Sequence, residues 1–115
     1  MEAKDRKPKI AADILWETML SATDELLVVV NKEGHIEALS SAYAEFLNVD
    51  QKKVVGLHVR DVIENTRMDV VIQTGVAELG EFQSIKGRKM IASRIPIVKD
   101  GKIIGAFGRV LFRNT

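Results

Sequence analysis

The chain has 115 residues, of which 46% are hydrophobic and 29% charged, and its formal net charge is +1. These values are ordinary for one globular domain with a real core, and they argue against a large basic surface for nucleic acid. The absence of cysteine excludes disulfides, thiolate zinc sites, iron–sulfur clusters and a cysteine nucleophile. No apolar run approaches the ~20 residues that span a bilayer, and the charged N-terminus lacks a signal-peptide core. We therefore expect a cytoplasmic protein without membrane contact.

The N-terminal part divides into a charged lead-in and a helix. Residues 1–9 carry no hydrophobic period, which predicts a disordered segment. Apolar side chains then recur at helical spacing over residues 10–22, which predicts a short amphipathic helix. A helix of this kind, outside the main core, packs on the sheet or on a second copy of the chain, and we favour a homodimer. The expected dimer interface consists of Ile10, Ile14, Leu15 and Trp16.

Two short strands and a helix are predicted next. Residues 25–31 and 35–39 read as strands joined by a turn that contains Gly34. Ser40 or Ser41 then caps a helix whose apolar residues share one face.

The central part of the chain predicts several short helical segments. Asp50 caps a helical turn, residues 59–63 form another, and residues 65–67 are an irregular connection. A longer helix is expected over residues 68–78, although Gly75 weakens it.

Three strands complete the chain: residues 80–85, and a long hairpin whose apolar runs flank Asp100 and Gly101. Strand runs separated by a helical block indicate an α+β domain with an antiparallel sheet. The sequence therefore predicts a single domain over residues 10–115 with five strands.

The register of the last hairpin decides where Arg94 points. A two-residue turn at Asp100 and Gly101 places Arg94 opposite Phe107, whereas a three-residue loop places it opposite Ala106. We favour the second register because it gathers most polar residues on one face and leaves Arg94 alone on the other. The residues that then border the space in front of Arg94 are Met90, Ala92, Ala106, Gly108 and Val110.

The order of these elements and their punctuating residues resembles a PAS domain, from about Ile10 to the end of the chain. The segments that carry the resemblance are VVVNKEGHI, SSAYAEFLNV, VVGLHVRDVI and IPIVKDGKIIGAFG. More narrowly, ENTRMDVVIQTGVAELGEFQSIKGRKMIASRIPI resembles the sensory PAS module at the front of bacterial enhancer-binding transcription activators. In those proteins an AAA+ ATPase and a helix-turn-helix domain follow. The resemblance implies a non-enzymatic sensor module that regulates transcription through downstream domains.

Two arginines are the candidate ligand-binding residues. Arg94 and Arg67 are expected to project into the PAS cavity and to hold a small anion, such as a carboxylate, through charge-assisted hydrogen bonds. The alternative is an internal ion pair with Glu78, Glu81 or Asp69, because buried charges are nearly always paired. A third possibility joins the two: an internal pair that the ligand opens. The sequence leaves these three open.

Other chemistries find little support in the sequence. Gas-sensing PAS domains take an axial histidine from the long helix, and residues 68–78 contain none, so haem is not expected. For His35 and His58, local hydrogen bonding or solvation is expected. Flavin is disfavoured by the lack of cysteine and of amide side chains on the relevant strands. We expect no metal, cofactor or catalytic site, and the runner-up function is a ligand-free dimerisation module.

Overall fold

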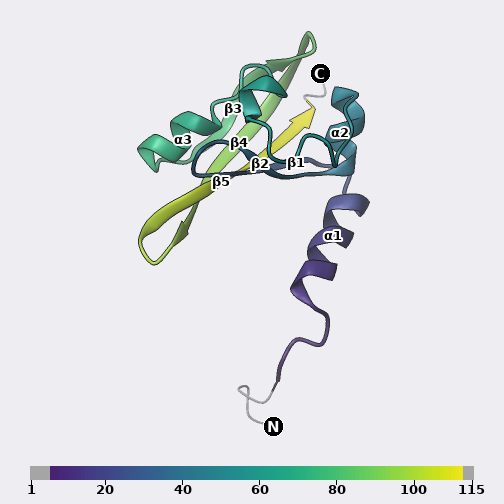
Figure 1. Cartoon of the computed structure of the whole chain (residues 1–115). Coiled ribbons are helices and arrows are strands. Elements are labelled where there is room, and N and C mark those ends of the chain that lie inside the picture. Colours follow the sequence, from purple (N-terminus) through teal and green to yellow (C-terminus); the bar gives the residue numbers. More distant parts are fainter. Residues whose placement is uncertain (1–5, 113–115) are drawn as a thin grey trace.

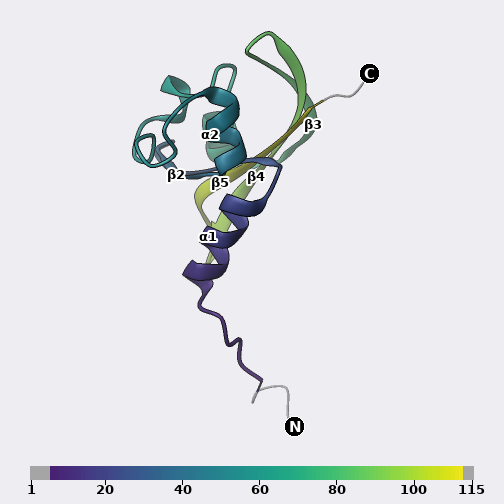
Figure 2. The ribbon, with the colours of Figure 1, turned by 90° about the vertical axis from the view of Figure 1, so that its right-hand side faces the viewer.

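The computed structural model describes residues 6–112, which form one five-stranded antiparallel sheet whose one face is covered by the helices that lie between its second and third strands in the chain (Figures 1 and 2). The strand order is β2-β1-β5-β4-β3. The predicted α+β class and five-stranded sheet are confirmed. In chain order, the elements are α1 (Ala12–Ala22), β1 (Leu26–Asn31), β2 (Ile36–Leu39), α2 (Ser41–Leu47), the 3-10 helix η2 (Val59–Asp61), α3 (Met68–Thr74), β3 (Glu78–Ile85), β4 (Arg88–Lys99) and β5 (Lys102–Phe112).

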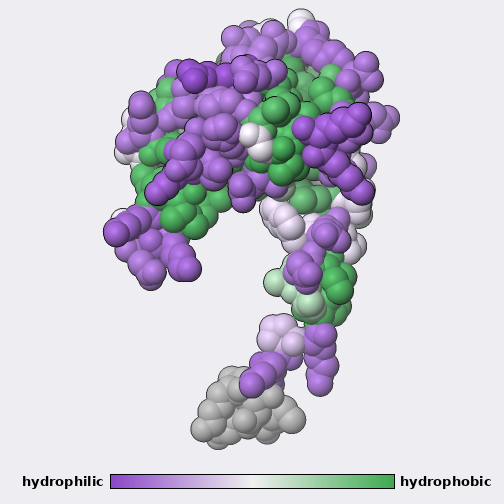
Figure 3. All heavy atoms as spheres, viewed as in Figure 1, coloured by the Kyte–Doolittle hydropathy of each residue, from purple (hydrophilic) through white to green (hydrophobic). Residues whose placement is uncertain are grey.

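The N-terminal helix α1 extends away from the domain (Figure 1). It starts two residues later than predicted, and residues 6–9 before it are exposed without helix or strand; residues 1–5 of the expected lead-in lie outside the described residues. Of the residues in α1, Leu20 alone is buried. The rest of its apolar side chains are exposed, and Figure 3 shows this apolar surface along the helix.

The hydrophobic core lies between the inner face of the sheet and the helical block. α2 packs on β1, and α3 packs on β4 and β5. Ser40 fastens α2 to the sheet, because its buried hydroxyl accepts from the N–H groups of Tyr43 and Leu27 and donates to the carbonyl of Glu25. The largest fully buried side chains are Tyr43, Ile36, Leu39, Ile85, Met90, Val30, Val59 and Val71.

The helix α3 is shorter than the predicted helix over residues 68–78. It ends at Thr74 because Gly75 adopts a left-handed conformation, with φ of +69°, and donates its N–H to the carbonyl of Val71. Gly75 therefore ends the helix, whereas the sequence predicted only that it would weaken a longer one. Glu78 consequently begins strand β3, where it pairs with Arg94 of β4.

The hairpin of β4 and β5 has neither of the two predicted registers, so the preferred register is wrong. The turn is the two-residue one, with positive φ at both Asp100 and Gly101. A bulge at Ile97 and Val98 then shifts the pairing by one, so that Arg94 lies opposite Gly108. The observed partner of Arg94, Gly108, lies two residues from Ala106, its partner in the preferred register. Because side chains alternate between the two faces of a strand, a shift by two residues leaves the same residues facing the core.

The same bulge exchanges the faces of two residues in β5. Val98 pairs with Ile103 and Ile97 with Gly105, which leaves Ile104 as the extra residue. Ile104, which the preferred register would place on the same face as Ala106, is 46% exposed, whereas Ile103 reaches toward Gly75. The inward alternation therefore starts at Ala106 and not at Ile104.

Candidate functional site

The side chain of Arg94 is buried on the inner face of the sheet, with 2% of the residue exposed. Its Nη1 donates to Oε1 of Glu78 at 3.0 Å, and its Nη2 donates to Oε1 of Gln83 at 2.7 Å. The contact with Glu78 is one of the internal ion pairs that the sequence left open. The guanidinium thus has both a counter-charge and a neutral acceptor, as a buried cation requires.

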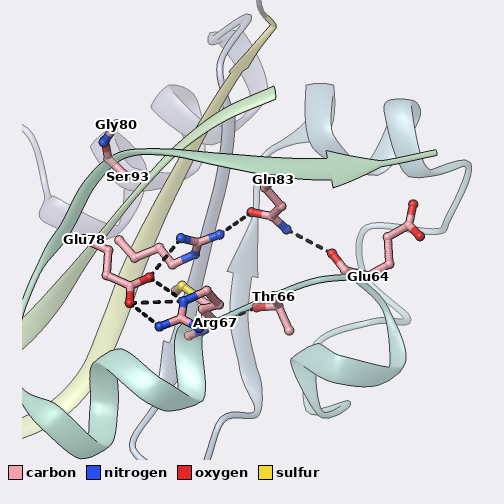
Figure 4. Close-up of polar contacts among 9 residues, drawn as sticks. Glu64, Thr66, Arg67, Glu78, Gly80, Gln83 and Ser93 are labelled. Carbon is pink, nitrogen blue, oxygen red and sulfur yellow. Dashed lines mark hydrogen bonds and ion pairs between the residues drawn. The ribbon is translucent and has the colours of Figure 1, made fainter. Parts of the chain in front are cut away.

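The same carboxylate of Glu78 also binds Arg67. The Nε of Arg67 lies 2.9 Å and 3.1 Å from the two carboxylate oxygens of Glu78, and its Nη2 donates to Oε2 at 2.7 Å (Figure 4). The exposed fractions of the three side chains are 53% for Arg67, 17% for Glu78 and 3% for Arg94. Glu78 therefore bridges a guanidinium at the surface and a guanidinium in the core.

The electrostatics of the three groups follow from this arrangement. Hydrogen bonds from Arg67, aided by the charge of Arg94, lower the pKa of the Glu78 carboxyl below its ordinary value of 4.5. The hydrogen bond to Glu78 raises the pKa of Arg67, whereas burial lowers that of Arg94. A guanidinium stays protonated across the physiological range. The cluster thus holds two cations and one anion.

The stability of the protein should depend on the ionisation of Glu78. Because its pKa is lower in the folded than in the unfolded state, ionised Glu78 stabilises the fold above pH 4.5, and this contribution is lost as the pH falls through the folded-state value. We expect urea unfolding to show a difference in stability between wild type and Glu78→Gln that shrinks from about pH 6 to about pH 3. A difference that is constant over this range would contradict the ion-pair description.

A bulge in strand β3 aims Glu78 at Arg94. Residues 81–85 of β3 pair with β4 in one register, in which Glu81 lies opposite Ala92. Continuing that register would place Leu79 opposite Arg94. The register shifts between Glu78 and Glu81, so that Glu78 pairs with Arg94. Leu79 instead points outward and is 67% exposed. Bulges commonly re-aim a side chain in this way beside functional sites.

Gly80 makes the bulge possible. Its φ is +67°, in the region that favours glycine, and its N–H donates to Oγ of Ser93. We expect Gly80→Val to lower the free energy of unfolding by about 1–2 kcal/mol in urea unfolding followed by circular dichroism. Substituting the adjacent exposed Leu79→Ala is the control and should change it by less than about 0.5 kcal/mol. Equal effects would mean that the bulge does not depend on glycine.

A series of contacts leads from Arg94 toward the C-terminal end of strand β5. The Nε2 of Gln83, whose oxygen accepts from Arg94, donates to the carbonyl of Glu64 at 3.0 Å. The carboxylate of Glu64 in turn accepts from the backbone N–H of Lys86. Figure 4 shows Gln83 between the arginine cluster and Glu64.

The series of contacts continues from Lys86 to the last described residue. Its Nζ donates to the carbonyl of Phe46 at 2.8 Å and lies over the Phe46 ring. That ring meets Phe112 edge to face at 5.3 Å between centroids. The guanidinium of Arg88 covers the Phe112 ring at 4.4 Å. The end of β5 is thereby tied to α2 and to the β3–β4 turn.

The structure brings the predicted site residues of the sheet together, but it leaves the binding prediction untested. They lie on the same inner face as Arg94, and Gly108 is opposite it. Gln83 and Glu64 are not among the residues that the sequence predicts for the site. The inward direction of the Gln83 side chain could have been predicted from the sequence, because the alternation of side chains along a strand places it on the same face as Ile85, which is buried. The residues predicted and found on this inner face are Met90, Ala92, Ala106, Gly108 and Val110.

The two histidines make local hydrogen bonds, as expected. Nδ1 of His35 lies 2.7 Å from the carbonyl of Gly56, and Nδ1 of His58 accepts from the N–H of Arg60 at 3.1 Å. Their rings meet edge to face. Over residues 6–112, no three side chains of His, Cys, Asp or Glu come together in a way that could hold a metal ion.

Two surface cavities flank Trp16, where α1 leaves the sheet. One, of about 500 Å³, lies between α1 and the segment around Glu37 and Gln51, and the other, of about 300 Å³, reaches Ile97 and Ile104 on the outer face of the sheet. Of the residues predicted for a dimer interface, Trp16 borders both hollows. All four are exposed: Ile10 and Ile14 by 57%, Leu15 by 44% and Trp16 by 41%.

Comparison with solved structures shows that the chain has the PAS fold. The PAS domain of BvgS from Bordetella pertussis superposes with a TM-score of 0.67 at 20% identity, covering 89% of this chain and 86% of that one. No protein-family model matches the sequence. None of the helices within residues 6–112 has the length and apolar character needed to cross a membrane.

Two curated relatives are sensor proteins from Halalkalibacterium halodurans. The sensor protein CitS is 30% identical over 100 residues, or 85% of this chain. A protein named "Probable C4-dicarboxylate sensor kinase" is 29% identical over 102 residues, or 87% of this chain. The chain spans about a fifth of the length of these relatives, 19% in each case.

Proposed function

We propose that this chain is the sensory PAS module of a sensor-kinase type of protein, and that it binds a small carboxylate between Arg94 and Arg67. The observation that carries the proposal is the buried guanidinium of Arg94, connected through one carboxylate to a second, surface-exposed guanidinium. Guanidinium groups bind carboxylates with two parallel hydrogen bonds, and a buried one does so without competition from water. The module acts by binding alone, without chemistry.

The names of the relatives support both parts of this proposal. Both are sensor proteins, one of them a kinase whose name specifies C4-dicarboxylates. They favour a kinase as the output domain over the transcription activator that the narrower sequence resemblance implies. A cytoplasmic location of the module agrees with this role, because a kinase uses cytoplasmic ATP.

The signal leaves the module through the end of β5. Binding at Arg94 changes the position of Gln83 and Glu64, and the contacts of Lys86 with Phe46 and of Phe46 with Phe112 carry this change to the exit of the strand. In this proposal the contacts have one arrangement in the free module and another in the bound one. A ligand shifts the populations of these two arrangements by its difference in affinity for them.

The module works as a homodimer in this proposal. The apolar side chains of α1 are exposed, and one of them, Trp16, borders two hollows; a second copy of α1 would cover the exposed side chains and the hollows. The expected interface consists of Ile10, Ile14, Leu15 and Trp16. Native mass spectrometry should show two subunits for the wild type and one for Trp16→Glu combined with Ile14→Glu. A wild-type monomer would contradict this part of the proposal.

The binding proposal is tested by thermal denaturation in the presence of citrate, malate and succinate. A ligand at a hundredfold excess over its dissociation constant stabilises the fold by about 2.7 kcal/mol. We expect a rise in melting temperature that is lost in Arg67→Gln, because this exposed side chain contributes to binding more than to folding. Arg60→Gln, an exposed arginine outside the site, is the matched control. No shift with any of the three acids, or an equal shift in both variants, would contradict the proposal.

A further inference from the structure

The carboxylate of Glu78 occupies the position that a ligand carboxylate would take in the proposed site. It accepts hydrogen bonds from Nε and Nη2 of Arg67 and from Nη1 of Arg94, so both guanidinium groups are engaged. This is the recognition geometry of a carboxylate by arginine. We infer that Glu78 is a built-in competitor, and that a dicarboxylate ligand displaces it from the two arginines. The inference rests on the proposed function.

The charges of the cluster indicate why a dicarboxylate is the appropriate class. With Glu78 in place, the two guanidinium groups and one carboxylate leave a formal charge of +1. Replacing Glu78 by a monocarboxylate leaves this charge unchanged and gains little. Replacing it by a dicarboxylate makes the site neutral, which a partly buried site favours, because an uncompensated charge in low dielectric is costly.

The position of Glu78 in the chain allows it to leave. It is the first residue of β3, and residues 75–77 before it have neither helix nor strand. On its other side lies the bulge with Leu79 and Gly80, where the ladder to β4 is interrupted. The side chain is 17% exposed, so the displaced carboxylate reaches water by a short movement. Arg67, half-exposed, marks the side from which the ligand enters.

The expected consequence is a weaker apparent affinity for the ligand. When the competent state is populated in a small fraction of molecules, the apparent dissociation constant rises by the inverse of that fraction. The internal contact therefore sets the ligand concentration at which the module responds. It also couples binding to the bulged start of β3, the strand that carries Gln83, the first residue of the proposed route to the end of β5.

The test is calorimetric titration of the 115-residue protein with succinate. We expect Glu78→Gln to bind succinate at least about tenfold more tightly than the wild type, because the competing charge is gone while the shape is retained. Glu81→Gln is the matched control: it removes a negative charge that also acts on Arg67 without removing a hydrogen bond to it. Its effect should stay within about threefold.

The outcomes separate the inference from the proposed function. Binding that is equally tight in wild type and Glu78→Gln, or equally changed in Glu78→Gln and Glu81→Gln, overturns the competitor role and leaves the binding site standing. Failure of succinate to bind to any variant overturns the inference for this ligand class, and failure of citrate and malate as well overturns the proposed function. Should Glu78→Gln not fold, Glu78→Asp serves instead: it keeps the charge but is one methylene too short to engage both arginines, and it should tighten binding at least threefold.

Discussion

Replacing Glu78 by glutamine is expected to lower the free energy of unfolding by about 3 kcal/mol at neutral pH. The substitution preserves shape and an acceptor oxygen but leaves the guanidinium of Arg94, 2% exposed, without its counter-charge. Removing one partner of a buried pair is costly because the remaining charge cannot return to water. Urea unfolding followed by circular dichroism measures the loss.

The control for this prediction is the other arginine of the cluster. Arg67→Gln breaks an ion pair of similar length, but the side chain of Arg67 is 53% exposed. Its loss should cost less than about 1 kcal/mol, as is usual for pairs at the surface. Glu78→Gln combined with Arg94→Met should be less destabilised than the sum of the single variants by at least about 1.5 kcal/mol. Additive effects would show that Glu78 and Arg94 are not coupled.

Replacing Gly105 by alanine is expected to cost about 3 kcal/mol or more. A Cβ atom at this position would lie 2.2 Å from the backbone carbonyl oxygen of Val30 in the neighbouring strand. The carbonyl belongs to the ladder between β1 and β5, which pairs Asn31 with Gly105. Relief of the clash therefore requires strands β1 and β5 to move apart, and overpacking that displaces backbone is at the upper end of measured effects.

A second glycine in the same strand is the matched control. A Cβ atom on Gly108 would meet Cγ1 of Val28 at 3.0 Å and Sδ of Met68 at 3.1 Å. Both are side-chain atoms, and methionine adapts easily, so Gly108→Ala should cost about 1 kcal/mol. Because both variants change the unfolded chain alike, the difference reports the folded state. Equal melting temperatures would contradict the close approach of β5 to β1.

The sequence predicts the elements well because each has a local cause. Ser40 caps α2 with its hydroxyl, and the Asp100–Gly101 pair forms the turn. The narrower resemblance to transcription activators finds no counterpart in the two curated relatives, which are sensor proteins. The fold alone does not determine the output domain, because one fold serves many functions.

The failures of prediction within the sheet have a shared origin in the bulges. The bulge at Ile97 and Val98 changes the partner of Arg94, and the one between Glu78 and Glu81 turns a strand residue toward it. A bulge adds one residue without any change in composition, so hydrophobic alternation does not reveal it. Gly80 is the local signal for the second, since an isolated glycine within a strand pattern indicates a bulge.

The position of the Glu78 side chain in a crystal structure of the complex with a dicarboxylate tests the central claim most directly. We predict a ligand carboxylate within hydrogen-bonding distance of Nη1 of Arg94 and of the guanidinium of Arg67, with Glu78 turned away from both. A ligand bound elsewhere, while Glu78 keeps its contacts with the two arginines, would contradict it.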